Sequence, residues 1–298
     1  MNRSCPYCSP IPSSSANRPA VIRCGYFKRT SDSRILQRLR CTICLRSFSL
    51  ATHNACYRQK KRNKNERLRR LLASGVSLRR AARELHLSRT TVARKLIFLG
   101  AQSKKALRQM NFESHKAAVV EFDDLETFEH TKCKPLSITL AVESKTRRIL
   151  GFRISQMNAK GHLAKIALKK YGRRKDSRSL NRALLFTDLK DFVIGDAVLK
   201  SDQNPHYIPD VKKYFPNATH LNFKGQRGSI VGQGELKKVR FDPLFSLNHT
   251  CAMARANINR LFRRTWCTTK IPARLEDHFA IYAVYHNQNL KQPPTSTA

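Results

Sequence analysis

The stretch Ala117-Ala118-Val119-Val120-Glu121-Phe122-Asp123-Asp124 decides the fold class of this chain. Its apolar run predicts a buried strand that ends at the two aspartates. Two more strands are predicted close behind it, at 137–142 and 149–154, with a hairpin turn at 143–146. Three strands joined by such short connections favour an antiparallel sheet.

The remaining elements extend this sheet into an α/β domain. A short strand is predicted at 196–200, ending at Ser201-Asp202. A helix at 211–215, a strand at 219–223 and a long amphipathic helix at 250–265 follow. This order matches that of an RNase H-like fold. Residues 114–290 are therefore predicted to form an RNase H-like catalytic domain.

Two aspartates stand at the ends of strands that are neighbours in that strand order. Asp123 follows the first strand and Asp202 the fourth, so their carboxylates are expected to converge. Two such carboxylates can hold a pair of hard cations, Mg²⁺ or Mn²⁺, about 4 Å apart for phosphoryl transfer. A single aspartate at a strand end is more often only a turn residue. The metal-site prediction therefore depends on the strand order and on the character of the segments upstream, at 1–56 and 60–106.

Four cysteines near the N-terminus have the spacing of a zinc site. They form two pairs, Cys5-Pro-Tyr-Cys8 and Cys41-Thr-Ile-Cys44. Two such turns can bring four thiolates around one tetrahedral zinc ion, and the alternative is a coincidence of cysteines. A closed site of four cysteines leaves no open position for chemistry, so residues 1–56 are predicted to be a structural zinc ribbon. Cysteine pairs of this kind indicate a reducing compartment and a cytoplasmic protein.

Residues 60–106 show the pattern of an all-α DNA-binding domain. Apolar positions mark three short helices, Gly75 ends the first, and Ser77 and Ser88 are placed to cap the second and third. The pattern resembles a helix-turn-helix of the resolvase and repressor type, which places the third helix in the major groove. A three-helix bundle with a solvated basic face is the alternative. The resemblance assigns base or backbone contacts to Arg89, Thr90 and Arg94, and phosphate contacts to Arg79, Arg80 and Arg83.

The charge of the chain points to a polyanionic partner. It has 58 Lys and Arg against 20 Asp and Glu, a formal net charge of +38. Binding of double-stranded DNA would screen this excess and release counterions from the phosphates. An anionic membrane is the rival partner, but no apolar run approaches the roughly 20 residues needed to cross a bilayer. We therefore expect DNA and no membrane as the partner, and a location at the nucleoid.

The order of these motifs resembles the transposases of bacterial insertion sequences, most closely the group typified by insertion sequence one. The resemblance is carried by the cysteine ribbon, the helix-turn-helix and three segments, 121–128, 200–207 and 260–270. It implies a DDE-type site whose first two carboxylates are Asp123 and Asp202. Spacings of three and four residues also place Arg260, Arg263 and Arg264 on or near one face of the last helix, where they either clamp phosphate or form a solvated face.

The third acidic residue of that family is not evident in this chain. Its position falls on Asn248, beside His249, and the nearest upstream glutamate is Glu235. His249 is the favoured substitute, because a neutral imidazole can bind metal or position a water molecule. The alternatives are that Glu235 takes the third position or that the third position is lost.

The predicted function is that of a transposase that binds terminal inverted repeats and cleaves and joins DNA strands. Both ends of an element must be held together, so a homodimer or larger assembly is expected. A decayed or co-opted DNA-binding protein is the main alternative, favoured by the pair Asn248-His249. A structure-specific DNA nuclease is the third.

Overall fold

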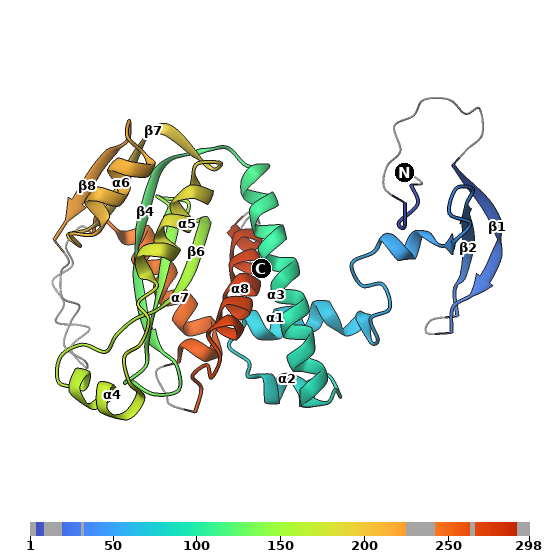
Figure 1. The fold of residues 1–298 in the computed structure, drawn as a ribbon, viewed down its shortest axis with the longest axis horizontal. Coiled ribbons are helices and arrows are strands. Elements are labelled where there is room, and N and C mark those ends of the chain that lie inside the picture. The colour runs from blue at the N-terminus through green and yellow to red at the C-terminus, as the bar shows by residue number, and fades with distance from the viewer. Residues whose placement is uncertain (1–3, 9–19, 31–32, 225–241, 263–265, 291–298) are drawn as a thin grey trace, which may run out of the picture. The chain divides into compact units, whose positions relative to one another are not determined.

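The computed structural model describes residues 4–8, 20–30, 33–224, 242–262 and 266–290, and it divides the chain into two units (Figure 1). The N-terminal unit is Met1–Asn63 and the C-terminal unit is Lys64–Ala298. The first contains the predicted zinc ribbon, and the second contains both the helix-turn-helix and the five-stranded sheet.

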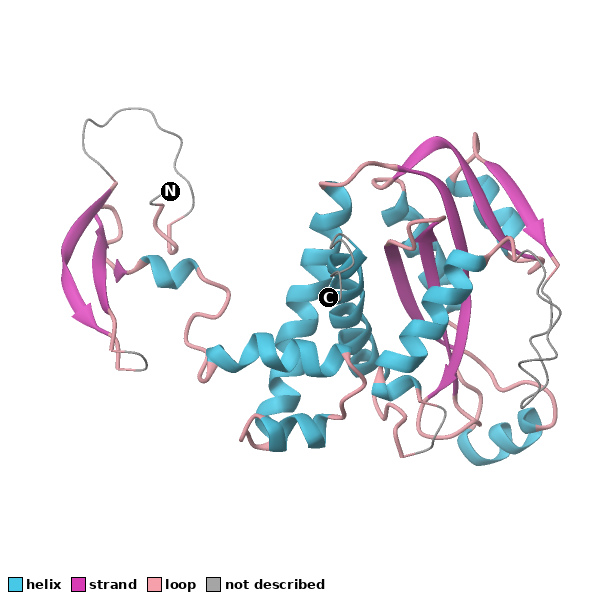
Figure 2. Ribbon diagram, turned by 180° about the vertical axis from the view of Figure 1, so that it is seen from behind, coloured by secondary structure: helices cyan, strands magenta, loops and turns pink. Residues whose placement is uncertain are grey.

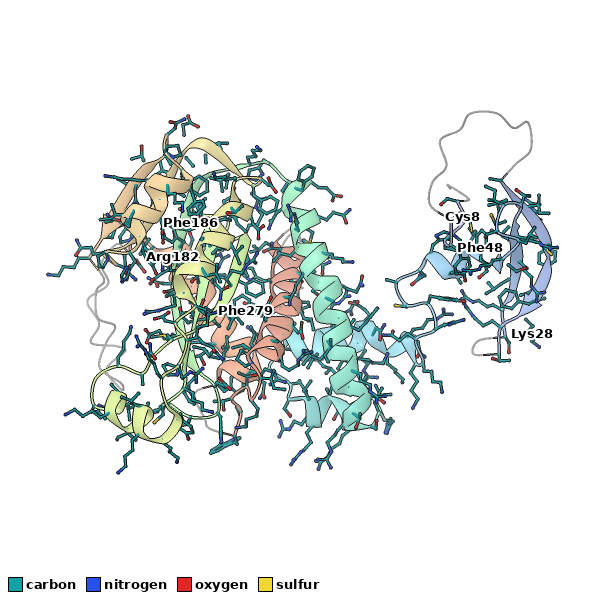
Figure 3. All side chains as sticks on the ribbon, viewed as in Figure 1. Cys8, Lys28, Phe48, Arg182, Phe186 and Phe279 are labelled. Carbon is teal, nitrogen blue, oxygen red and sulfur yellow. The ribbon has the colours of Figure 1, made fainter. Side chains whose placement is uncertain are left out.

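The N-terminal unit contains a small antiparallel sheet. Its strands are β1 (Val21–Lys28), β2 (Ile35–Cys41) and β3 (Ser47–Phe48), followed by one turn of 3-10 helix, η1 (Leu50–His53). The buried core of this sheet is Leu39, Cys41 and Phe48, with other cysteines packed against it (Figure 3). A core of so few side chains is too small to make this unit stable by itself. A bound metal ion would supply a large share of its stability.

The C-terminal unit is built on a mixed five-stranded sheet in the order β6-β5-β4-β7-β8. These strands are β4 (Ala117–Phe128), β5 (Pro135–Glu143), β6 (Ile149–Gln156), β7 (Val193–Asp202) and β8 (Thr219–Phe223). The first three are antiparallel neighbours, and β7 and β8 run parallel to β4. This arrangement resembles an RNase H-like fold, as the element order predicted.

Several boundaries differ from the prediction: β7 begins at Val193 where the strand was expected from 196, and the helix expected at 211–215 is α6 (Tyr207–Tyr214). The first strand was expected to end at Asp123-Asp124, but β4 continues to Phe128, which pairs with Pro135 of β5. The acidic residues therefore lie inside a paired strand. Tertiary pairing with β5 outweighs the weak β-propensity of aspartate, since sheet partners supply the backbone hydrogen bonds.

Helices cover both faces of the sheet (Figure 2). On one face, α5 (Arg178–Leu189) and α6 (Tyr207–Tyr214) pack around Phe122 and Phe186. On the other face lie α7 (Phe245–Asn257), α8 (Pro272–Leu290) and the end of α3 (Arg89–Phe112), with Phe279 in the core. A short helix, α4 (Leu163–Tyr171), lies in the connection between β6 and α5.

The C-terminal helices also depart from the prediction. The helix expected at 250–265 is α7, which ends at Asn257 because Ile258 turns to an extended conformation and is buried in the core. A one-turn 3-10 helix, η4 (Asn259–Leu261), follows. The sequence did not predict α8, which is buried almost all round and so shows no amphipathic period. No helix of the described residues is long and apolar enough to cross a membrane.

The helix-turn-helix consists of α1 (Asn65–Ala73), α2 (Leu78–Glu84) and α3 (Arg89–Phe112), with η2 (Arg62–Lys64) before it. Both predicted caps are present: the hydroxyls of Ser77 and Ser88 accept hydrogen bonds from the amides of Arg80 and Thr91. His86 adopts a φ of 52° in the turn between α2 and α3. This left-handed residue redirects the chain between the two helices.

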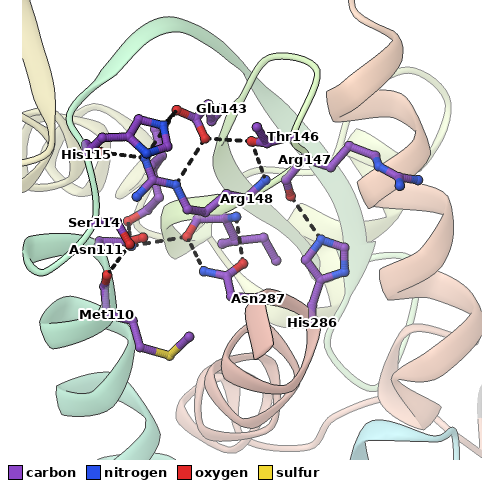
Figure 4. A network of polar contacts seen from close by, with 12 residues as sticks. Met110, Asn111, Ser114, His115, Glu143, Thr146, Arg147, Arg148, His286 and Asn287 are labelled. Atoms are coloured by element: carbon purple, nitrogen blue, oxygen red, sulfur yellow. Dashed lines mark hydrogen bonds and ion pairs between the residues drawn. The ribbon is translucent and has the colours of Figure 1, made fainter. Parts of the chain in front are cut away.

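The third helix runs past residue 106, where the sequence placed the end of this domain, and joins the core of the sheet layer. Gly100 lies against Asp277 of α8, where an added Cβ would come within 2.4 Å of the aspartate Cβ. Further along, Asn111 of α3 and Asn287 of α8 bind the backbone of Ile149 in β6 (Figure 4). Helix α3 therefore belongs to two cores, one shared with α1 and α2 and one with the sheet.

Candidate functional site

The four predicted zinc ligands come together at one point of the N-terminal unit. The Sγ atoms of Cys5, Cys8, Cys41 and Cys44 all lie within 4.8 Å of one another. Cys41 ends β2, and the amide of Cys44 lowers the pKa of its thiol to about 7. Four sulfur donors at this spacing, one of them readily ionised, match the tetrahedral chemistry of zinc. The cluster could bind zinc, and the β1–β2 hairpin beside it is consistent with a zinc ribbon.

The two predicted catalytic aspartates lie on adjacent parallel strands. Glu121 of β4 is in register with Lys200 of β7, so Asp123 and Asp202, each two residues further on, lie on the same face of the sheet. Burial raises the pKa of Asp123 to about 7, and the charge of Asp202 contributes to that shift. The charge of Asp202 therefore lies close enough to disfavour ionisation of Asp123.

Hydrogen bonds hold both carboxylates in place. The hydroxyl of Tyr207 donates to Oδ1 of Asp123 at 3.1 Å, and the amide of Asn204 donates to Oδ1 of Asp202 at 3.0 Å. Sequence reasoning missed Tyr207, which starts α6 five residues after Asp202 and could have been found from that position. The neighbouring Asp124 is bound differently, accepting a hydrogen bond from the hydroxyl of Thr139 on β5 at 2.5 Å. Alternation along β4 directs it to the opposite face of the sheet.

The candidates for the third position lie on or before α7. His249 lies beside the guanidinium of Arg147, with Nη1 3.2 Å from both ring nitrogens, and its ring packs on Phe245. Asn248 donates to the carboxylate of Asp242 at 2.8 Å. Glu235 lies outside the described residues.

Cys251 of α7 lies within the electrostatic influence of Asp123. Burial raises the pKa of Cys251 to about 12, and the charge of Asp123 also contributes. Helical spacing from Asn248 to Cys251 was the signal that could have found it. Across the described residues, the cysteine cluster is the only group of three or more metal-ligating side chains, so no third ligand closes on Asp123 and Asp202.

The predicted DNA-contacting residues of the helix-turn-helix all lie on its outer surface. Each of the six is exposed: Arg79, Arg80, Arg83, Arg89, Thr90 and Arg94. Their apolar neighbours, including Val92 and Leu96, are buried in the three-helix core. The arrangement leaves a basic surface available at α2 and the start of α3.

The predicted basic residues after α7 are placed differently. Arg260 is partly buried in η4 and donates to the hydroxyl of Thr269 at 3.3 Å, and burial lowers its pKa. Arg263 and Arg264 lie outside the described residues. The side chain of Arg260 is thus turned toward the protein interior.

Comparisons with known proteins add little beyond this geometry. No family model matches the chain, and no curated protein matches it. Among solved structures, it is similar to the crystal structure of the Mos1 strand transfer complex, at 10% identity and a TM-score of 0.23. That similarity covers 79% of this chain and 80% of the other. The resemblance to an RNase H-like fold therefore depends on the order and direction of the five strands.

Proposed function

We propose that this protein is a transposase, which cleaves and joins DNA strands by phosphoryl transfer with two divalent metal ions. The observation that carries the proposal is the position of Asp123 and Asp202, each two residues beyond the paired residues Glu121 and Lys200 on adjacent parallel strands of an RNase H-like sheet. The exposed basic helices α2 and α3 belong to the same unit and support DNA as the substrate. A group like that of insertion sequence one is the family we propose.

The chemistry of the two carboxylates fits hard cations. Carboxylate oxygens are the donors that Mg²⁺ and Mn²⁺ prefer, and the raised pKa of Asp123 means that a nearby positive charge would favour its ionised form. Two such ions, when bound, supply stabilisation of both the attacking and the leaving oxygen of a phosphodiester. The hydroxyl of Tyr207 keeps the carboxylate of Asp123 oriented toward the site. In the proposed reaction, water cleaves at the ends of the element and the freed 3′-hydroxyl then attacks target DNA.

His249 remains our proposal for the third position, with Asn248 and Glu235 as alternatives. For His249 to reach Asp123 and Asp202, its imidazole must give up its contact with Arg147. The zinc ribbon and the helix-turn-helix are proposed to recognise terminal inverted repeats, in three domains at 1–56, 60–106 and 114–290. We also propose that the protein is cytoplasmic, associates with the nucleoid, and forms a homodimer or larger assembly on DNA.

One observation favours a second candidate function, that of a DNA-binding protein without cleavage activity. Within the described part of the chain, no third ligand side chain completes the site at Asp123 and Asp202. Such a protein would keep the basic surface of α2 and α3 and would occupy its DNA site without cutting.

The test is cleavage of labelled DNA carrying the element's own ends, with Mg²⁺ or Mn²⁺. Asp123→Asn and Asp202→Asn should abolish nicking and retain DNA binding. Asp124→Asn is the matched control, because it makes the same change one residue along β4 on the opposite face, and it should retain activity. His249→Ala, Asn248→Ala and Glu235→Ala then identify the third residue. A wild-type protein that binds the ends tightly and never cuts would establish the second candidate instead.

A further inference from the structure

The connection between β6 and α5 carries a concentration of positive charge that the proposed active site does not use. Residues 157–175, which we call the basic connection, contain seven Lys and Arg and no Asp or Glu. They include α4 and the loops on both sides of it. All of these residues are described by the structure.

Helix α4 contributes almost nothing to the core of the protein. Ala167 is its single buried residue, whereas Ile166 is 52% exposed and Leu168 is 60% exposed. Most helices in proteins are stabilised by burying an apolar face, and the apolar face of α4, at Leu163, Ala167 and Tyr171, is mostly only partly buried. Its role is therefore unlike that of α5 or α6, which pack on the sheet.

Contacts with acidic residues hold the basic connection at the carboxyl end of β4. Lys160 forms an ion pair of 2.9 Å with Glu126, and Arg174 forms one of 3.0 Å with Glu129. The ammonium of Lys134 lies 4.5 Å from the ring centre of Tyr171. These contacts place α4 beside the continuation of the strand that contains Asp123.

The other basic side chains of the connection point to solvent. The exposed lysines and arginines without an ion pair to any described residue are Lys165, Lys169, Lys170, Arg173 and Lys175. Lys165 and Lys169 are four residues apart and lie on one face of α4. Arg173, Arg174 and Lys175 line an open hollow of about 450 Å³ with Asn158 and Asp176. A row of exposed cations, unpaired among the described residues, beside a basic hollow suits a phosphate backbone.

The position of α4 relative to the helix-turn-helix supports a DNA ligand. Helices α2 and α4 both lie at the lower end of the C-terminal unit in Figure 1 and Figure 2. The carboxyl end of β4 lies at the same end in these views. A polyanion that binds the exposed arginines of α2 can therefore follow the same end of the unit toward α4.

We propose that the basic connection binds the sugar–phosphate backbone of double-stranded DNA, as a second DNA-binding surface beside the proposed catalytic strand. This inference rests on the proposed function, because it assigns a contact to the same substrate. The contact reads no sequence, since lysine and arginine side chains on phosphates carry no base information. A second copy of the chain is a poorer ligand for this surface, because its own charge of +38 would repel the connection.

The experiment measures DNA affinity of the full-length protein as a function of salt, on an element end and on a random duplex. The triple variant Lys165→Ala, Lys169→Ala and Arg173→Ala is compared with wild type. Each lost phosphate contact lowers the slope of log K against log salt by about 0.9, so we expect the slope to fall by about 2 to 3 on both duplexes. Thermal melting checks that the variant is folded. We expect it to fold because the three replaced side chains are exposed.

A matched control removes the same charge from another surface. Lys190, Lys212 and Lys213 are exposed on or next to α5 and α6, and their triple alanine variant should keep the wild-type slope. A slope unchanged in the first variant, or lowered equally in the control, overturns the inference while leaving the proposed function intact. A first variant with unchanged DNA binding but altered sedimentation would show that the connection binds protein, and would also overturn it. Wild-type protein that binds neither duplex would refute both the inference and the proposed function.

Discussion

Replacing Asp123 by asparagine is expected to stabilise the fold above neutral pH while abolishing cleavage. The carboxyl of Asp123 has a pKa of about 7 against an ordinary value of 3.8, first because of burial and then because of Asp202. Between these two values the folded protein holds a proton that the unfolded chain has released. Stability must therefore fall as pH rises through this window, since the folded state binds more protons.

The size of the effect follows from the shift. Three pKa units correspond to about 4 kcal/mol at full burial, and partial solvent access reduces this to about 2 to 4 kcal/mol. Asparagine keeps the shape and still accepts the hydrogen bond from Tyr207, but it carries no charge. Its advantage in unfolding free energy should be near zero at about pH 4 and reach its maximum above about pH 7.

Urea unfolding of wild type and Asp123→Asn at several pH values measures this difference directly. Asp202→Asn should reduce the pH dependence without removing it, because burial remains the larger cause of the shift. Mg²⁺ at ten times its dissociation constant should stabilise wild type by about 1.4 kcal/mol at pH 8 and have a smaller effect on Asp123→Asn. An equal difference between wild type and Asp123→Asn at pH 4 and pH 8 would refute the reasoning.

Three further predictions test other parts of the fold. Gly100→Ala should cost about 1 to 3 kcal/mol, because its Cβ would lie 2.7 Å from a backbone Cα atom of α8. Gly195→Ala, which meets nothing within 4 Å, is the control in the same denaturation series. Asn287→Ala should cost about 1 to 3 kcal/mol, because the buried amide of Ile149 loses its acceptor; an unchanged melting temperature would contradict this. Cys44→Ser should remove bound zinc, measured by atomic absorption, and leave the unfolding of the C-terminal unit unchanged.

Features that depend on neighbours in the chain could be predicted from the sequence. Ser77 and Ser88 cap their helices because a hydroxyl reaches the amide three residues later. The two cysteine pairs were recognisable because cysteine thiolates at this spacing commonly bind a zinc ion. Asp123 and Asp202 were assigned to neighbouring strands because the order of the elements matched a known strand arrangement.

Features that depend on distant contacts could not be predicted in this way. Helix α8 escaped prediction because it is buried on nearly all sides and lacks an amphipathic period. The extension of β4 to Phe128 depends on its pairing with β5. The position of His249 beside Arg147 joins residues 102 apart in the sequence, which no local pattern indicates.

The sequence by itself determined the chemistry that this protein carries: four thiols, two strand-borne aspartates and a large excess of positive charge. These are properties of residue type and spacing, and they persist in any conformation. Only the tertiary structure decided which groups meet, including Tyr207 with Asp123 and the basic connection with the carboxyl end of β4. The physical reason is that packing and strand pairing bring together segments far apart in the chain, and their burial and charge then set each group's pKa.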